Sequence, residues 1–314
     1  MKVNYEDYVD FFLNEINSKT FSIYEKRFVF IFGGPYQKDS DHSFRKEFFD
    51  KASTLDNKDK YEFLYAEELF LNLSLFNSQY QYVNVALIEK ISGYVVDAII
   101  IIPESVGSYC EIGYFAHSFH LKQKILVANN HEYNESPSFL KKGIIDLINH
   151  DSLYKGDIIP LKKSECNVAE FNKALKRIKQ NLSGKTINKK FFKDKYSKGK
   201  KSETNLNDYY RFRFVIFFEI IHFFRYVTFQ EARDVFKKVF GSYEDDELQI
   251  YASILLTLKL IKTPYGDHEA LRSTRTEGFM SSEQAVSKMS EKKMEIEEYH
   301  RKNDTQLYAR FKRE

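Results

Sequence analysis

Glu111 is the side chain of this sequence whose surroundings best suit it for chemistry. Ahead of it, residues 95–102 form a β-branched run with the length of a strand and Asp97 as its one charge, which predicts a strand buried on both faces of a parallel sheet. Ser108 can then cap a helix that begins near Tyr109 and carries Glu111 in its first turn. Parallel α/β sheets bind ligands at the carboxyl ends of their strands, and a helix N-terminus favours anions, so we expect Glu111 in a binding site.

Small and polar residues in two predicted loops could bind a sugar or a phosphate near this helix. The loop between the strand and the helix offers Glu104, Ser105, Gly107 and Ser108. A second loop follows an earlier predicted strand, and its glycines would let the backbone approach a ligand closely. It consists of Gly33, Gly34, Pro35 and Tyr36. Tyr36 would either stack on a base or cover the sheet edge. Asp97 would either contact substrate or hydrogen-bond a neighbouring loop, and the second role is favoured because an unpaired buried carboxylate is costly.

Alternating strands and helices predict an α/β fold for residues 1–165, with a flavodoxin-like or Rossmann-like parallel sheet covered on both faces. The expected strands are residues 27–32, 61–66, 95–102, 124–128 and 157–161, and the expected helices are residues 5–16, 42–55, 67–93 with interruptions, and 136–149. The glycines after the first strand lack the GxGxxG spacing, and no Walker A lysine follows them. Neither a dinucleotide fingerprint nor a P-loop is therefore indicated.

A basic segment follows this predicted catalytic domain. Residues 151–202 carry 15 Lys and Arg against 5 Asp and Glu, and residues 166–205 are expected to form a helix and a basic linker. The densest run, residues 185–201, mixes lysines with aromatic side chains, so it would either bind phosphates and unpaired bases or form a solvated linker. Its candidate nucleic-acid contacts are Lys189, Lys190, Lys193, Lys195, Lys198, Lys200 and Lys201.

Residues 206–280 have the pattern of a winged helix-turn-helix domain. Helices are expected at residues 208–227, 229–240 and 247–260, followed by a two-stranded wing at residues 260–262 and 271–274. Residues 203–314 carry 18 basic against 19 acidic side chains, whereas duplex readers have a concentrated basic face. We expect a module that contacts protein or RNA, with Arg272 and Arg275 as backbone contacts. The tail at residues 281–314, rich in Lys and Glu, is expected to be a solvated helix.

Composition limits the class of protein. The chain has 314 residues and a net charge of +3, and its two cysteines, Cys110 and Cys166, form no CxxC pair. We therefore expect neither a disulfide scaffold nor a metal site. No basic segment with an apolar core begins the sequence, and no apolar run reaches the length of a membrane span. These features predict a cytoplasmic protein without a membrane segment.

Four features of the sequence together resemble the nucleoside 2-deoxyribosyltransferase family: GGPY at residues 33–36, Glu89, Asp97, and PESVGSYCEIGYF at residues 103–115. The resemblance implies that Glu111 is the nucleophile and that Glu89 is the acid that protonates the leaving base. It places the family's acidic ribose-binding position on Ser105, or on Glu104 if the loop shifts by one residue. The family's aromatic hydroxyl falls on Phe30, which lacks one.

More narrowly, the loop PESVGS, the following EIG and the later winged-helix pattern resemble the deoxyribosyltransferase-like effectors encoded with bacterial retrons. This resemblance implies an N-glycosidase toxin of anti-phage defence that cleaves NAD as its substrate and needs no cofactor. It implies restraint by a reverse transcriptase and its branched RNA–DNA product (msDNA), and self-association of the chain. Two alternatives stay open: a nucleoside 2-deoxyribosyltransferase or nucleoside hydrolase, and a non-enzymatic winged-helix regulator that binds nucleic acid.

The chemistry of an N-glycosidic bond explains why a glutamate would be needed. The bond breaks through an oxocarbenium-like state, which a carboxylate on one face of the sugar can stabilise or trap. In NAD the nicotinamide ring is cationic and leaves the ribose as a neutral base, so NAD cleavage needs no strong acid. A purine or pyrimidine leaving group would give Glu89 a larger role as an acid. Glu89 could instead bind the ribose or lie on a solvated helix face. The structural alternative for Glu111 is a favourable interaction with its helix dipole, worth under about 1 kcal/mol.

Overall fold

The computed structural model describes residues 5–18, 21–23, 27–34, 43–54, 61–76, 84–130, 137–154, 159–161, 169, 172–173, 176, 186–187, 205–264, 269–281 and 286–311. The chain forms two compact units, and each is built from separate stretches of sequence. We call residues 25–68 and 84–183 the sheet unit, and residues 1–24, 69–83 and 184–314 the helical unit. The expected boundary at residue 165 differs from this division, because the first helix belongs with the C-terminal part of the chain.

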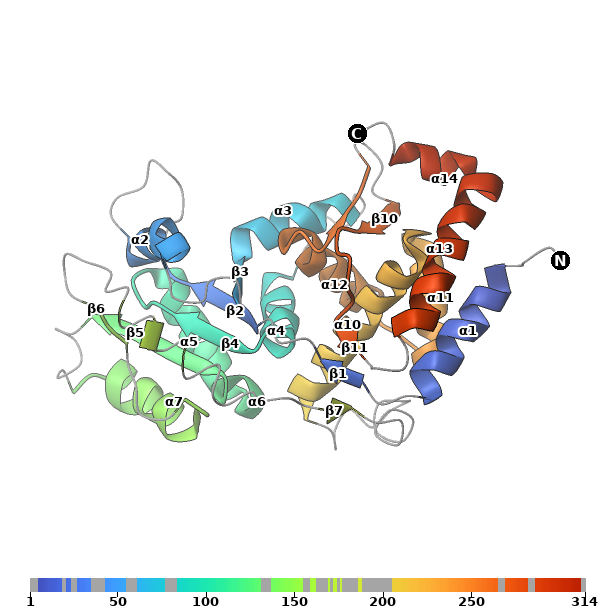
Figure 1. Cartoon of the computed structure of the whole chain (residues 1–314). Coiled ribbons are helices and arrows are strands. Elements are labelled where there is room, and N and C mark those ends of the chain that lie inside the picture. Colours follow the sequence, from blue (N-terminus) through green and yellow to red (C-terminus); the bar gives the residue numbers. More distant parts are fainter. Residues whose placement is uncertain are drawn as a thin grey trace. The chain divides into compact units, whose positions relative to one another are not determined.

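A parallel β-sheet forms the centre of the sheet unit (Figure 1). Within the described residues it has five strands in the order β3-β2-β4-β5-β6, and each pairs with its neighbours in parallel. They are β2 (Arg27–Phe32), β3 (Tyr61–Tyr65), β4 (Ala98–Ile101), β5 (Ile125–Asn130) and β6 (Ile159–Leu161). Counted along the sheet unit, the order is 2-1-3-4-5, which is the flavodoxin-like doubly wound order. The predicted parallel α/β sheet is confirmed.

Alternate residues of β2 are buried on opposite faces of the sheet. Val29 and Ile31 share a core cluster with Phe48 of α2 (Phe44–Lys51). On the other face, the ring of Phe32 lies 5.0 Å from that of Phe115 in α5 (Val106–His117). Burial on both sides explains why the strands read as continuous apolar runs. Helices α2 and α5 therefore leave the sheet on opposite faces.

The helix before β4 continues further than the sequence predicts. The described residues of the range 67–93 lie mainly in two helices, α3 (Ala66–Phe76) and α4 (Val85–Val95), so the β-branched run at residues 95–102 begins as helix. The ammonium group of Lys124 donates to the carbonyl oxygens of Tyr94 at 2.8 Å and Val96 at 2.6 Å, and so binds the end of α4. This contact and the packing of the apolar face of α4 override local β propensity. The strand is shortened to β4.

Other helical segments complete the sheet unit. They are the 3-10 turn η1 (Ala52–Thr54), α6 (Phe119–Lys122), a π-helical segment η4 (Leu140–Ile145) and α7 (Asp146–Asp151). The expected helix at residues 136–149 corresponds to η4 and α7, and Ser136 lies outside the described residues.

A nearly fully buried aromatic helix, α10 (Leu206–Phe224), forms the centre of the helical unit. It is followed by β8 (Tyr226–Thr228), α11 (Phe229–Phe240), α12 (Asp245–Thr257), β9 (Ile261–Lys262) and β10 (Ala270–Ser273). The three strands pair antiparallel in the order β8-β10-β9 within the described residues. Thr228 caps α11 in a capping box with Glu231, as the Thr-x-x-Glu spacing allows. The three predicted helices are confirmed within a few residues at each end.

Both ends of the described chain pack in the helical unit. In α1 (Tyr5–Ser18), the ring of Phe12 lies 5.1 Å from that of Phe223 in α10. Near the other end are α13 (Val286–Asn303) and α14 (Thr305–Arg310). Leu307 and Phe311 share a core cluster with Tyr226 and Ala270. The expectation of a solvated tail is therefore wrong for α14, whose Leu307 packs on Tyr226 and Ala270, whereas most described side chains of α13 are exposed or half-buried and only Ile296 and His300 are buried.

A further small sheet pairs strands that are far apart in sequence. Its order is β11-β1-β7, from β11 (Met280–Ser281), β1 (Phe21–Ile23) and β7 (Thr186–Ile187). None of the helices in the described part of the chain is long and apolar enough to cross a bilayer.

Candidate active site at the carboxyl edge of the sheet

The carboxyl ends of the neighbouring strands β2 and β4 meet where the chain leaves the sheet in two directions. After β2 the chain passes through Gly33 and Gly34 to α2 on one face, and after β4 it passes through Glu104 to α5 on the other face. Such a switch point is where doubly wound α/β proteins form a ligand crevice. The predicted loop residues Gly33, Gly34, Glu104 and Ser105 lie on these two connections, and Glu111 lies on the helix that follows the second.

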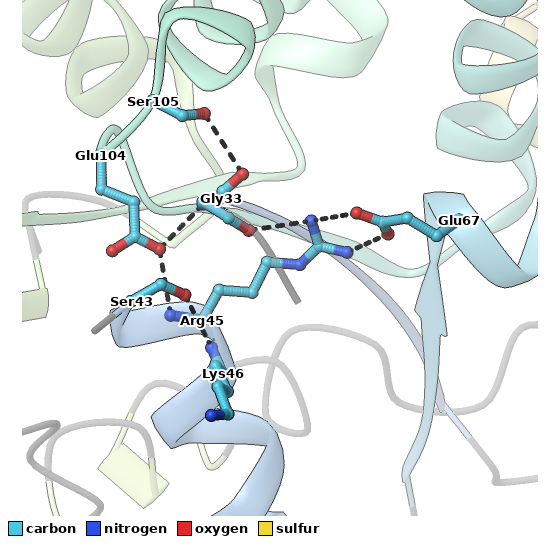
Figure 2. Close-up of polar contacts among 8 residues, drawn as sticks. Gly33, Ser43, Arg45, Lys46, Glu67, Glu104 and Ser105 are labelled. Carbon is cyan, nitrogen blue, oxygen red and sulfur yellow. Dashed lines mark hydrogen bonds and ion pairs between the residues drawn. The ribbon is translucent and has the colours of Figure 1, made fainter. Parts of the chain in front are cut away.

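The Glu104 carboxylate, on the connection from β4 to α5, hydrogen-bonds to the backbone of the connection from β2 to α2 and of the start of α2 (Figure 2). Its Oε1 accepts hydrogen bonds from the backbone N–H of Gly34 at 2.8 Å and of Arg45 at 3.1 Å, and its Oε2 accepts from Phe44 at 2.7 Å. A Cβ at Gly34 would lie 3.0 Å from Glu104, so glycine is needed there for close approach. Glu104 thus occupies the N-terminus of α2, where an anionic ligand would otherwise bind. The described part of the predicted phosphate-side loop donates its Gly34 N–H to this carboxylate.

Two serines fix the start of α5. The Ser105 hydroxyl accepts from the N–H of Ser108 at 3.1 Å, and the Ser108 hydroxyl accepts from the N–H of Ser105 at 2.9 Å, which is a reciprocal capping box. Ser105 also donates to the carbonyl oxygen of Gly33 at 3.4 Å. The cap is therefore Ser105 rather than Ser108, and Glu111 lies in the second turn of α5 rather than the first. Binding of a ribose hydroxyl by either serine stays a prediction.

Burial raises the pKa values of both Glu111 and Glu89, the two predicted catalytic glutamates. Burial raises the pKa of Glu111 to about 7, although the nearby Arg45 opposes the shift. Glu89, on α4 and 8% exposed, has its pKa raised to about 8, first by burial and then by the charge of Glu111. Glu111 Oε2 is buried and has no hydrogen-bond partner within the described residues. The charge of Glu111 thus reaches Glu89, and two carboxylates with different pKa values are suited to different roles.

Arg45 and Glu67 lie beside this pair, and the sequence pattern did not single them out. Arg45 is 4% exposed and donates from Nη1 to the carbonyl oxygen of Gly34 at 3.4 Å and to Glu67 Oε1 at 3.0 Å (Figure 2). Its Nη2 pairs with the other oxygen of Glu67, and its guanidinium lies 5.7 Å from the ring centre of Tyr65. The sequence signal that could have identified them is a basic residue, Arg45, at the start of the helix after the Gly33–Gly34 loop, and an acidic residue, Glu67, just after the next strand.

Comparison with known proteins identifies the family to which this chain belongs. The family model described as STM3845 retron effector protein matches residues 41–263, a stretch that contains Arg45, Glu89 and Glu111. The chain belongs to this retron effector family.

Two curated proteins of Escherichia coli are similar to it. One, "Retron Ec73 putative ribosyltransferase/DNA-binding protein", is 30% identical over 140 residues, which is 45% of this chain and 43% of the relative. The other, "Retron Ec86 putative ribosyltransferase/DNA-binding protein", is 30% identical over 87 residues, 28% of this chain and 27% of the relative. The matched stretches span less than half the length of either relative.

Asp97 of this retron effector lies away from the candidate site. It precedes β4, at the amino edge of the sheet, and its Oδ2 accepts from the N–H of Phe28 at 2.8 Å. The alternative of a hydrogen bond is what the structure has, although the partner is the backbone of strand β2 rather than a neighbouring loop. This place in the fold gives no support to a contact between Asp97 and substrate. Phe30, at the family's hydroxyl position, is fully buried.

The remaining predicted site residues of the effector fall into three groups. Outside the described residues are Pro35, Tyr36, Lys189, Lys190, Lys193, Lys195, Lys198, Lys200 and Lys201. Arg272 lies on β10, and its guanidinium is 4.9 Å from the ring centre of Tyr226. Arg275 follows β10, and its guanidinium is 5.4 Å from the ring centre of Phe279. Their contact with nucleic acid stays a prediction. Gly107 is exposed in the first turn of α5, and a Cβ there would lie 4.0 Å from Glu111 Oε1. Among the described side chains, no three His, Cys, Asp or Glu residues gather as a metal site would require.

Proposed function

We propose that this retron effector is an N-glycosidase toxin of anti-phage defence that hydrolyses NAD to nicotinamide and ADP-ribose. The observation that carries the proposal is the presence of two buried glutamates, Glu111 on α5 after the carboxyl end of β4 and Glu89 on α4, with pKa values raised to about 7 and about 8 and with the charge of Glu111 acting on Glu89. The names of the two relatives, which call them putative ribosyltransferases, support chemistry at an anomeric carbon.

The proposed reaction needs one ionised carboxylate. The bond between the ribose C1′ and the nicotinamide nitrogen breaks, and its electron pair neutralises the pyridinium ring. Glu111 stabilises the oxocarbenium-like ribose from one face or bonds transiently to C1′, as a nucleophilic carboxylate does in glycoside cleavage. Water then adds to C1′ and loses a proton, which yields ADP-ribose and restores Glu111.

Glu89 has the properties of a neutral hydrogen-bond donor at pH 7. With a pKa of about 8, it is mostly protonated and can donate to a ribose hydroxyl or to the carboxamide oxygen of nicotinamide. The same protonation favours one alternative function. A purine or pyrimidine must gain a proton as it leaves, and a protonated Glu89 can supply it. A nucleoside 2-deoxyribosyltransferase or nucleoside hydrolase is therefore the second candidate.

Product analysis of the purified protein, alone and with its retron partners, tests both candidates. The protein is incubated with NAD and with several ribo- and deoxyribonucleosides, and the released base is identified by chromatography. We expect nicotinamide from NAD, with release reduced about a thousandfold or more in Glu111→Gln and unchanged in Asp151→Asn, a carboxylate of the same unit paired with Lys122. Base exchange between deoxynucleosides would instead support the second candidate. Wild-type release in folded Glu111→Gln would refute the enzymatic role of Glu111.

For the helical unit, we propose a winged-helix module that contacts the retron reverse transcriptase and its msDNA. The element order helix, strand, two helices and two strands, with sheet order β8-β10-β9, supports this proposal, as do the relatives' printed names. Binding of a labelled branched RNA–DNA by Arg272→Ala and Arg275→Ala, measured at several salt concentrations, tests it. Loss of one phosphate contact should weaken binding and lower the slope of log binding constant against log salt concentration by about one. Self-association and a cytoplasmic setting stay part of the proposal.

A further inference from the structure

Two buried polar side chains of α10 hold the segment at residues 273–279, which begins at the last residue of β10. The Glu219 carboxylate accepts a hydrogen bond from the backbone N–H of Phe279, and His222 Nδ1 lies 3.0 Å from the hydroxyl of Ser273. Glu219 and His222 are buried in a stretch of α10 that is otherwise apolar. The segment is therefore fixed to α10 at both of its ends.

Arg225, which directly follows α10, contacts the middle of this segment. Its Nη1 donates to the carbonyl oxygen of Arg275 at 3.4 Å. The next residue, Tyr226, pairs in register with Arg272 of β10, whose guanidinium lies 4.9 Å from the Tyr226 ring centre. We call Arg225, Arg272 and Arg275 the arginine corner. It lies where the end of α10, β8 and the end of β10 meet, and all three side chains are half-buried.

Two arginines of the corner have no carboxylate partner. Within the described residues neither Arg225 nor Arg272 forms an ion pair. The buried Arg213 of the same unit differs, because Glu247 accepts from two of its nitrogens, at 2.6 and 3.0 Å. A guanidinium that is not bound by a carboxylate keeps its planar set of donors for another anion, and phosphate matches these donors well.

The backbone of Arg225 is strained. Its φ is 65°, in the region that favours glycine. Strained backbone is held in place by the surrounding structure, and it is common where a protein binds a ligand. Glycine would suit this backbone better but would bring no charge to the corner. The residue type at this position thus fits a need for a cation.

Helix α12 is poorly suited to contact nucleic acid. It occupies the place of the recognition helix in the proposed winged-helix order, but its start is acidic. The exposed side chains there are Glu244, Asp245 and Asp246. These carboxylates would repel phosphates. A nucleic acid that binds the helical unit should therefore lie on a different surface.

We propose that the arginine corner binds the phosphate backbone of a nucleic acid, and that α12 does not contact it. The inference rests on the proposed function of the helical unit and adds the surface through which that unit binds. Tyr226 and Phe279, the rings next to Arg272 and Arg275, are buried, so bases cannot stack on them. Binding at the corner should accordingly depend on salt and not on base sequence.

Two matched substitutions at strained positions test the inference. Arg225→Gly removes one cation of the corner, and Lys259→Gly removes an exposed cation just after α12, where φ is 54°. Binding of the full-length protein to labelled duplex DNA, single-stranded DNA and RNA of unrelated sequences is measured by fluorescence anisotropy at several salt concentrations. We expect Arg225→Gly to weaken binding roughly tenfold near 0.1 M salt and to lower the slope of log binding constant against log salt concentration by about one. Lys259→Gly should keep the wild-type affinity and slope, and Arg225→Lys should keep the wild-type slope.

Two further variants cover the role of α12 and a failure of Arg225→Gly to fold. Asp246→Asn, at the exposed start of α12, should leave binding unchanged. Arg272→Gln removes a charge of the corner without changing a strained backbone, and it carries the same expectation as Arg225→Gly. A wild-type slope in the folded Arg225 and Arg272 variants overturns the inference. Equal losses in Arg225→Gly and Lys259→Gly, or severalfold tighter binding in Asp246→Asn, also overturn it, because they would place the nucleic acid next to α12.

The same titrations separate this inference from the proposed function. If the wild-type protein binds nucleic acid and the corner variants bind equally well, only the inference fails. If the wild-type protein binds the reverse transcriptase but no nucleic acid, the inference and the proposed contact with msDNA both fail, and the corner serves an acidic protein surface instead. A loss in the corner variants that is confined to DNA or to RNA supports the inference and identifies which of them supplies the phosphates.

Discussion

Glu111 and Glu89 carry the same functional group, and only their surroundings make them differ. Both are removed from water, which raises both pKa values, and Arg45 opposes this shift in both, but only the pKa of Glu89 is raised further by the charge of Glu111. The first proton lost from the pair therefore comes mainly from Glu111. An ionised carboxylate and a protonated carboxyl can then coexist near neutral pH, as acid and nucleophile do in other glycosidic sites.

The pH profile of base release should report this pair. With NAD as substrate, the rate should rise as pH passes through about 7, where Glu111 ionises, and then level off. With a substrate whose base must be protonated, the rate should also fall above about 8, where Glu89 loses its proton. Initial rates between pH 5.5 and 9 on both substrate classes measure this. A profile that falls across pH 7 would contradict the role of Glu111 as the ionised group.

Protonation of Glu89 should also appear in stability. Its pKa is raised from 4.5 to about 8 in the folded protein, so the folded state binds more protons than the unfolded state between these values. Stability from this group is full below pH 4.5 and is lost as pH rises toward 8. Glu89→Gln should therefore have little effect at pH 4.5 and stabilise the sheet unit by roughly 1–3 kcal/mol at pH 8.5. Urea unfolding at both pH values checks this, and an equal effect at the two would contradict it.

At the scale of elements, the position of α5 depends on its cap. Ser105 and Ser108 satisfy the first N–H groups of the helix, and Ser105 also reaches Gly33 on the neighbouring connection. The helix that carries Glu111 is thereby fixed to the end of β2. A weakened cap should loosen the carboxylate as well as the helix.

Substitution of this cap gives a measurable cost. Ser105→Ala should lower the free energy of unfolding by about 1 kcal/mol, because one N-cap hydrogen bond is lost, whereas Ser105→Gly should cost only a few tenths. Ser118→Ala provides the comparison. Ser118 caps the four-residue α6 with a hydrogen bond of 3.5 Å, so its loss should cost less. Equal costs for the alanine variants in urea unfolding would show that Ser105 has no special role.

At the scale of the whole chain, the two ends share one unit. The ring of Phe12 in α1 lies 5.1 Å from Phe223 and 6.0 Å from Phe224 of α10, and α14 packs against β8 and β10. A fragment cut at residue 165 would therefore separate α1 from its partners. A complete helical unit requires residues from both ends of the sequence.

Removing the anchor of α1 should test this organisation. Phe12 is fully buried, so Phe12→Ala should destabilise the helical unit by about 3–5 kcal/mol. Phe11, which is only partly buried and stacks on Phe223 at 6.0 Å, serves as the control, and Phe11→Ala should cost clearly less. Denaturant unfolding followed by circular dichroism compares the two. Similar small losses would mean that α1 contributes little to the unit.

Local signals in the sequence were enough to determine several elements and the candidate carboxylates. Strand β2 ends at Phe32 as its apolar run predicts, and α11 begins after Thr228 as its capping pattern predicts. These features depend on neighbouring residues, which a sequence displays directly. Glu111 followed from the pattern of strand, loop and helix around it and from the resemblance to a known family, and Glu89 from that resemblance alone.

Tertiary structure alone decided how these elements form a site. Glu104 accepts from Gly34 and Phe44, which are 70 and 60 residues away, and this use of its carboxylate cannot be read from adjacent residues. The burial that raises the pKa values of the two glutamates, and the charge of Arg45 that opposes this, also come from segments far apart in sequence. The sequence specifies which residues carry carboxyl groups. The burial of Glu111 and Glu89 and their closeness to other charges arise only when β2, β4 and their helices pack together.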